Sequence, residues 1–269
     1  MSSYNNILKE LDKINEASEE SVYIPSMRGT TTVKPINIKK QKDIIKSSID
    51  PSSTSLAFNL CINKIISECV DSEKILVSDK PAVMIAMRNS NIGAVYNGTI
   101  DDTPVSISLS DVISKYTEID TTLVYKTKVE TGNVTVNLTI PDLETDNKFM
   151  IACARVVKAP SAGDYSQVSD NISEMFVYEV AKFVSSIQFR SETSGLSGTE
   201  PVTELSSVRF SELPASQCIK LVEMLPVTMN QGIVKYISSI RDYEELFTVV
   251  TVDDKSLHLP VDASLFTLE

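Results

Sequence analysis

Apolar residues recur at helical spacing along much of this chain and predict a largely helical protein. The first predicted helix covers residues 4–19, and one of its faces is apolar: Ile7, Leu8, Leu11 and Ile14. The same spacing predicts further helices at 38–49, from Pro51 to Cys69, from Asp79 to Asn89, from Asp142 to Val156, at 214–224 and at 226–241. The most regular apolar stripe belongs to a helix over 171–188, in which Glu179 is the polar exception.

Alternation of apolar and polar residues between these helices predicts antiparallel hairpins. Two short strands are expected around Gly29, which supplies the unusual backbone angle of their turn. Hairpins over 93–109 and 122–140 are expected to form one small β module, and a last hairpin lies near the C-terminus. The Ser-, Thr- and Gly-rich stretch 191–207 is interpreted as a surface loop. The predicted fold class is therefore α+β, a mostly helical body with two or three antiparallel β-hairpins.

Two stretches of the chain share one plan of helix, short connector and hairpin. The first runs from Met87-Arg88 to Leu109 and has Asp101-Asp102 at its turn. The second runs from Ile240-Arg241 to Val261 and has Asp253-Asp254 at its turn. This pattern suggests a repeated recognition module, and chance is the alternative because a helix followed by a hairpin is common.

The pattern also divides the chain into candidate segments. Residues 1–21 are interpreted as an N-terminal helical arm, and residues 22–140 as helices plus a β-hairpin module. Residues 141–269 are interpreted as a helical region that ends in a C-terminal hairpin. The alternative is one continuous domain, because 269 residues allow one large domain or two small ones.

Charge and composition narrow the classes of partner. The chain is 42% hydrophobic and 23% charged, as folded proteins are, and its formal net charge is -11. Such a surface repels phosphate, so nucleic acid is not expected as a partner. The basic stretch Lys34–Lys46 is interpreted either as a contact for an acidic partner or as a solvated helix face. No membrane partner is expected, since no apolar run is long enough for a membrane helix, and the N-terminus does not resemble a signal peptide.

Candidate catalytic groups are few. The single histidine, His258, lies in a predicted strand, where histidine is more often structural than catalytic, and no GxSxG sequence supplies a serine. The chain has neither a Walker-type phosphate loop nor GxGxxG. Glu179 is interpreted as a partner of Lys182 or an edge residue of its stripe, with an acid–base role as the alternative.

The cysteine and aspartate residues of the sequence give little support for metal binding or redox chemistry. The four cysteines are interpreted as buried reduced thiols in apolar helical runs, and they form no CxxC pair: Cys61, Cys69, Cys153 and Cys218. Both Asp-Asp pairs lie at predicted turns, where aspartate serves the backbone, and no EF-hand spacing surrounds them. The sequence therefore predicts no catalytic, cofactor-binding or metal-ligating residue, no cofactor and no enzyme activity.

Four stretches carry a resemblance to a known family. They are Ile24-Pro25-Ser26 with Gly29 and Val33-Lys34-Pro35, then Gln41-Lys42-Asp43-Ile44-Ile45-Lys46, then Ala86-Met87-Arg88-Asn89-Ser90-Asn91-Ile92-Gly93, and last Tyr236-Ile237-Ser238-Ser239-Ile240-Arg241 with a terminal hairpin closing at Leu265-Phe266. In this order they resemble the baseplate hub and hub-assembly proteins of T-even-type phages with contractile tails.

The resemblance implies a non-enzymatic part of the baseplate hub, or a factor that assembles the hub or protects the tape-measure protein. The implied partners are other phage tail and baseplate hub proteins, in the host cytoplasm during assembly or in the virion tail baseplate. Some phage proteins of this layout carry paired cysteines in their hairpins, as in a zinc knuckle. Neither hairpin here holds a cysteine, so no metal residue is transferred. The alternatives to this function are an intracellular adaptor unrelated to phage and a hydrolase with a cryptic site.

Overall fold

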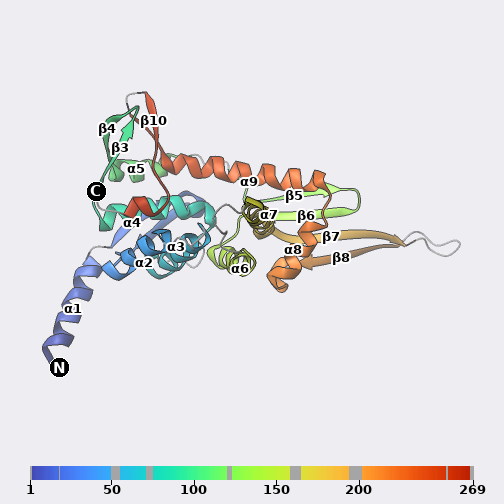
Figure 1. The fold of residues 1–269 in the computed structure, drawn as a ribbon, viewed down its shortest axis with the longest axis horizontal. Helices are drawn as coiled ribbons and strands as arrows, with labels where there is room; N and C mark the ends of the chain where they lie inside the picture. The colour runs from blue at the N-terminus through green and yellow to red at the C-terminus, as the bar shows by residue number, and fades with distance from the viewer. Residues whose placement is uncertain are drawn as a thin grey trace. The chain divides into compact units, whose positions relative to one another are not determined.

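The computed structural model describes residues 2–17, 19–49, 55–70, 75–119, 123–157, 165–193, 202–252 and 254–266. Over these residues the fold is α+β, which confirms the predicted class: helices predominate, and the strands pair antiparallel in small sheets (Figure 1). The chain forms two compact units, each treated by itself below. One consists of Met1–Thr122 with Asp242–Glu269, and the other of Leu123–Arg241.

These units differ from the segments expected at 1–21, 22–140 and 141–269, because the last residues of the chain pack with the first. The Gln41 side-chain amide donates a hydrogen bond to the Phe266 carbonyl oxygen at 3.0 Å, and the Phe266 side chain is fully buried. The two residues lie 225 positions apart. A contact of that separation leaves no trace in the local hydrophobic pattern.

Over its described residues, the first unit combines helices with three two-stranded hairpins. Its helices are α1 (Ser2–Ala17), α2 (Ile38–Ile49), α3 (Ser55–Cys69), α4 (Lys80–Asn91), α5 (Leu109–Ser114) and the end of α9 (Val227–Thr248). Its strands pair as β1 (Glu20–Ile24) with β2 (Gly29–Val33), β3 (Val95–Ile100) with β4 (Thr103–Ser108), and β9 (Val249–Val252) with β10 (Lys255–His258). Short 3-10 turns are η1 (Pro25–Met27), η2 (Val77–Asp79), η3 (Lys115–Glu118) and η5 (Ala263–Phe266).

Helix α4 forms the centre of the core of this unit. Every residue from Pro81 to Arg88 is buried, and a helix enclosed on all sides is apolar on most of its circumference. Arg88 is the charged exception, and its guanidinium donates to the Gly93 carbonyl oxygen at 2.8 Å. Nearby in the core, the Phe247 ring meets Tyr116 and Tyr243 edge-on, each at 5.1 Å between ring centroids.

The hairpin turns are set by residues with positive φ. Asp101 and Asp102 adopt φ of 48° and 62°, as a two-residue turn of the primed type requires, which confirms that this pair forms the hairpin turn. Asp254 takes φ of 63°, and Asp253 lies outside the described residues. In the β1–β2 turn the left-handed residue is Arg28, with φ of 49°, so the prediction that Gly29 supplies this angle is wrong.

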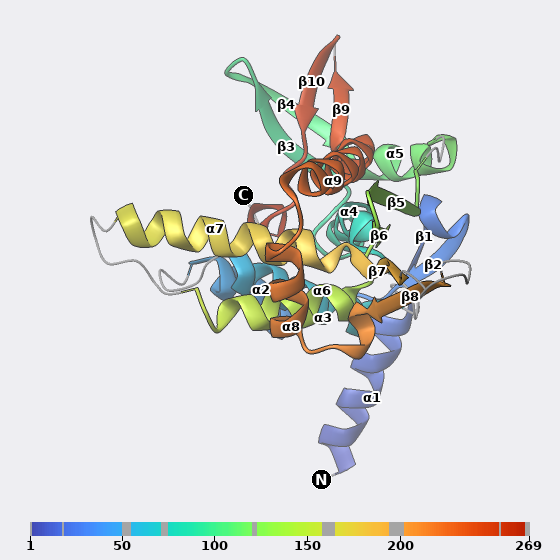
Figure 2. The ribbon, with the colours of Figure 1, turned by 90° about the vertical axis from the view of Figure 1, so that its right-hand side faces the viewer.

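Both stretches with the shared plan form a helix followed by a hairpin. Helix α9 continues to Thr248, beyond the end expected at residue 241. The hairpins β3–β4 and β9–β10 lie side by side, as Figures 1 and 2 show. A Cβ at Gly98 of β3 would stand 3.1 Å from Leu257 Cδ2 of β10, so the absence of a side chain there permits the close approach.

The second unit is built on one four-stranded antiparallel sheet in the order β5-β6-β7-β8. The strands are β5 (Lys126–Thr131), β6 (Val134–Thr139), β7 (Val184–Thr193) and β8 (Val202–Arg209). The helical elements are α6 (Leu143–Ala154), α7 (Tyr165–Lys182), η4 (Phe210–Glu212), α8 (Ala215–Glu223) and the first part of α9. The β module expected over 93–140 does not form, because β3–β4 belong to the first unit and β5–β6 pair with β7.

Strand β7 accounts for two wrong predictions. The helix expected over 171–188 ends at Lys182, since Val136 pairs with Ile187 and Val134 with Phe189 across the sheet. The loop expected over 191–207 is strand at its two ends, and residues 194–201 lie outside the described part. Apolar residues at 180, 184 and 187 fit a helical spacing, and the sheet pairing that overrides it comes from distant strands.

Close packing between α9 and β5 gives a prediction about stability. A Cβ at Gly232 would lie 2.9 Å from Val129 Cγ1, and a valine side chain is too stiff to move aside cheaply. We expect Gly232→Ala to lower the free energy of unfolding by about 1–2 kcal/mol in urea titrations, although alanine favours helix.

Two further variants test the cause. Adding Val129→Ala to Gly232→Ala should recover much of that loss, because it removes the clashing methyl groups. Gly29→Ala is the control, since a Cβ there meets only the Met27 carbonyl oxygen at an ordinary 3.7 Å. Losses that simply add in the double variant would contradict the steric explanation.

Candidate interaction surfaces

Helix α1 carries an apolar stripe that is exposed to solvent. The exposed fractions are 66% for Tyr4, 59% for Ile7, 41% for Leu8 and 50% for Leu11. Spacings of three and four residues place them on one side of the helix, the side that the sequence predicts to be apolar. An exposed stripe of this kind is typical of a helix that docks against another protein.

Helix α7 carries a second exposed stripe, in the second unit. Tyr165, Val168, Ile172 and Phe176 follow one another at intervals of three, four and four residues, and their exposed fractions are 85%, 40%, 63% and 51%. Ile172 and Phe176 belong to the apolar stripe that the sequence predicts for this helix, and both side chains are exposed in the structure. The opposite side of α7 faces the core instead, through residues that include Asn171 and Tyr178.

The start of this stripe was missed because the helix was expected to begin at 171, whereas it begins at Tyr165. The intervals from Tyr165 through Val168 to Ile172 continue the helical period backwards, and this signal is present in the sequence. The sequence does not show that the stripe is exposed, because its exposure depends on which side of α7 packs against α6 and α8.

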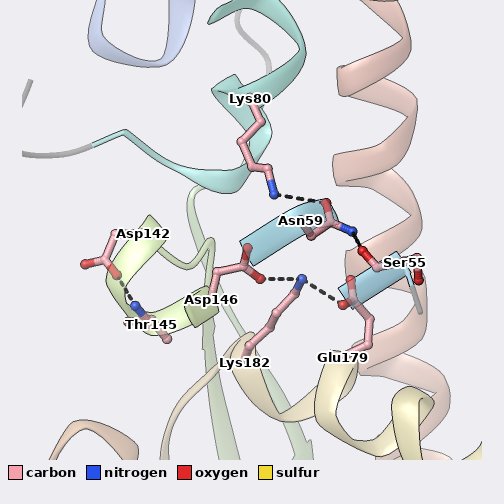
Figure 3. A network of polar contacts seen from close by, with 8 residues as sticks. All are labelled: Ser55, Asn59, Lys80, Asp142, Thr145, Asp146, Glu179 and Lys182. Atoms are coloured by element: carbon pink, nitrogen blue, oxygen red, sulfur yellow. Dashed lines mark hydrogen bonds and ion pairs between the residues drawn. The ribbon is translucent and has the colours of Figure 1, made fainter. Parts of the chain in front are cut away.

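A partly buried ion cluster joins α6 to α7 (Figure 3). The Lys182 ammonium donates to Asp146 Oδ1 at 2.8 Å and pairs with Glu179 Oε2 at 2.7 Å. The Asp146 side chain is 1% exposed, and that of Lys182 is 11% exposed. Burial alone would lower the pKa of Lys182, but Glu179 and Asp146 outweigh it and raise the pKa. The ammonium therefore stays charged and tied to two carboxylates.

This cluster decides the interpretation of Glu179. The ion pair with Lys182 confirms the expected partner, and it engages the carboxylate that an acid–base role would require. Lys182 also lies 5.5 Å from the centre of the Phe183 ring. The geometry is that of a structural clamp between two helices.

The remaining candidate groups lie apart from one another. His258 is exposed on β10, opposite Val249 of β9. Asp101 is held at its turn by the Lys255 ammonium at 2.7 Å. In the described part of the chain, no three side chains of histidine, cysteine, aspartate or glutamate gather as metal ligands would.

All four cysteines lie in helices and carry free thiols. Cys69, Cys153 and Cys218 are buried as predicted, and Cys61 is half-buried. Burial raises the pKa of each thiol, to about 11 for Cys153, where Glu174 and Glu179 add to the effect. Neutral thiols are therefore expected at physiological pH.

Comparisons with family models, with curated proteins and with solved structures gave no match to this chain. Among the described helices, none combines the length and apolar character needed to cross a membrane. The interpretation of function therefore depends on the surfaces themselves.

Proposed function

We propose that this chain is a non-enzymatic assembly protein that acts by binding other proteins through exposed apolar helix faces. The observation that carries the proposal is the stripe Tyr4, Ile7, Leu8 and Leu11 of α1. A helix of 16 residues has little stability of its own in water, so a partner that covers this stripe would stabilise it. The stripe on α7 offers a second contact of the same kind.

The more specific proposal is a component or assembly factor of the baseplate hub of a contractile-tailed phage. Its support is the resemblance of the four sequence stretches to T-even-type hub and hub-assembly proteins. On this proposal the partners are other tail or hub proteins, the tape-measure protein included, and the chain acts in the host cytoplasm or in the virion tail baseplate. No nucleic acid or membrane partner is proposed, and no cofactor.

The test is association with defined tail proteins. Co-expression with the hub and tape-measure proteins of the same phage should yield a complex on size-exclusion chromatography. Its presence in purified virions would identify a structural subunit, and its absence there a transient assembly factor. A chain that binds none of these proteins would contradict the phage proposal. A complex formed only with host proteins would favour the alternative function, an intracellular adaptor unrelated to phage.

The role of α1 gives a prediction of its own. Ile7→Asp with Leu11→Asp places two charges on the apolar stripe, and we expect the affinity for the partner to fall at least about 100-fold. The free energy of unfolding should change little, because both side chains are exposed in the free protein. Titration calorimetry measures the first quantity and urea denaturation the second.

A matched control adds the same charge elsewhere on the helix. Asn5→Asp with Asn6→Asp also introduces two negative charges on exposed positions, but away from the stripe. This variant should bind within a few-fold of the native chain. Equal losses for both pairs would show that charge repulsion, and not apolar contact, governs binding.

A further inference from the structure

An amine and a thiol meet at the contact between α2 and α3 in the first unit. The Lys40 Nζ atom lies 3.2 Å from the Cys69 Sγ atom. Lys40 is in the first turn of α2 and Cys69 is the last residue of α3, so the contact joins the start of one helix to the end of the next. The side chains are already close enough for a single bridging atom to fit between nitrogen and sulfur after a small contraction.

The surroundings hold this pair in place. The Lys34 amide donates to the Cys69 carbonyl oxygen at 2.7 Å, which fixes the end of α3. The Glu68 carboxylate lies 3.3 Å from Lys40 Nζ, where it can accept a proton from the ammonium. Cys69 is fully buried, whereas the Lys40 side chain is 23% exposed and marks the side from which a small oxidant can arrive.

The charges that face the pair define its resting state. Burial raises the pKa of the Cys69 thiol, against the opposing influence of Lys40. Burial alone would lower the pKa of Lys40, but its contacts with Cys69 and Glu68 raise it. At neutral pH the pair is therefore a thiol beside an ammonium, which is unreactive until an oxidant arrives and the amine loses a proton.

Cys61 on the same helix provides an internal comparison. It is half-buried and thus more accessible than Cys69, and the nearest side chain that hydrogen-bonds it is Ser47. Ordinary oxidation follows accessibility and would favour Cys61. A reaction that depends on a neighbouring amine would favour Cys69.

We infer that Lys40 and Cys69 form an oxidant-dependent covalent cross-link in which one oxygen atom bridges Nζ and Sγ. The oxidant is a peroxide, represented by hydrogen peroxide. The first molecule oxidises the thiol to sulfenic acid and is reduced to water. A second peroxide completes the N–O–S bridge as the neutral amine loses one hydrogen.

The overall reaction balances. One thiol, one amine and two hydrogen peroxide molecules give one N–O–S bridge and three water molecules. One S–H and one N–H bond are lost, one S–O and one N–O bond are formed, and the four electrons removed reduce the two peroxides. A dithiol reductant reverses the reaction, since two such molecules return these electrons and restore thiol, amine and water.

The bridge would tie α2 to α3 and close the loop of chain between residues 40 and 69. Closing a loop of this length restricts the unfolded chain, as a disulfide does. The oxidised protein should therefore melt higher by roughly 5–10 °C. The inference depends only on the first unit and is independent of the proposed function.

The experiment treats the full-length protein with hydrogen peroxide and measures intact mass, followed by peptide mapping. The expected product gains about 14 Da, from one oxygen added and two hydrogens lost, and links the peptides that contain Lys40 and Cys69. Its yield should rise from about pH 7 to pH 10 as the small neutral fraction of the amine grows, and dithiothreitol should remove it.

Three variants decide the origin of the product. Lys40→Arg keeps the positive charge but has no primary amine, so the linked peptide should disappear. Cys69→Ser should abolish it as well, whereas Cys61→Ser should leave it intact. The variants are compared only after circular dichroism shows native helix content.

Several outcomes would overturn the inference. They are oxygen addition at Cys69 without a linked peptide, oxidation of Cys61 while Cys69 stays reduced, and a product of the same mass that persists in Lys40→Arg. A protein that stays unmodified over the whole pH series would overturn it too.

Discussion

A Lys182→Met variant is expected to lose about 3–5 kcal/mol of unfolding free energy, which is the largest loss predicted for this protein. Methionine keeps an unbranched apolar side chain of nearly the same length but removes the ammonium from between Asp146 and Glu179. The Asp146 carboxylate, 1% exposed, then loses the cation that offsets its desolvation. Urea denaturation at neutral pH, followed by far-ultraviolet circular dichroism, measures the loss.

The chain contains a matched control for this prediction. Lys255 pairs with Asp101 at 2.7 Å, nearly the same distance, but the two side chains are 57% and 75% exposed. Solvent screens such a pair, so Lys255→Met should change the unfolding free energy by about 0–1 kcal/mol. Similar losses in both variants would contradict the explanation that burial makes the Lys182 cluster important.

An Asp79→Asn variant is expected to be more stable than the native chain at neutral pH, by up to about 3 kcal/mol. Asp79 is fully buried, and burial raises the pKa of its carboxyl from 3.8 to about 6, although Ser26 and the Leu76 amide favour the charged form. Asparagine can still accept the Leu76 N–H, which is 2.9 Å from the carboxylate in the native chain.

The direction of the pH dependence follows from the sign of this shift. The folded pKa lies above the unfolded one, so the contribution of Asp79 is fully present below pH 3.8 and is lost as the pH rises through about 6. The difference between the variant and the native chain should therefore grow between about pH 4 and pH 7 and then level off. Parallel stability curves over this range would show that Asp79 does not titrate as the structure indicates.

The sequence was most informative where local physics decides the structure. Helix α2 spans 38–49 as predicted, because the proline at position 51 restricts the backbone of the residue before it and so marks the end of the helix. The Asp101-Asp102 turn was also predicted, since aspartate tolerates positive φ in hairpins. The apolar stripe of α1 was predicted as well, because it depends on one helix alone.

The sequence was uninformative where residues far apart along the chain decide the local structure. Val184 and Ile187 fit a helix by spacing, and only their pairing with β6 makes them strand. Which side of α7 is buried depends on α6 and α8, so the apolar spacing that includes Phe176 does not show that half of this side chain is exposed. The contact between Lys40 and Cys69 joins residues 29 positions apart, and neither residue carries a motif that points to the other.

The discontinuity of the first unit affects the order in which the newly made chain can fold. The segment Asp242–Glu269 supplies core residues such as Phe247 and Phe266, yet it is synthesised after the whole of Leu123–Arg241. On the ribosome the second unit is complete before the first has all its core. The N-terminal helices must therefore wait, partly uncovered, until residues 242–269 have been made, and a chain truncated at residue 241 would lack core residues of the first unit while the second unit stays complete.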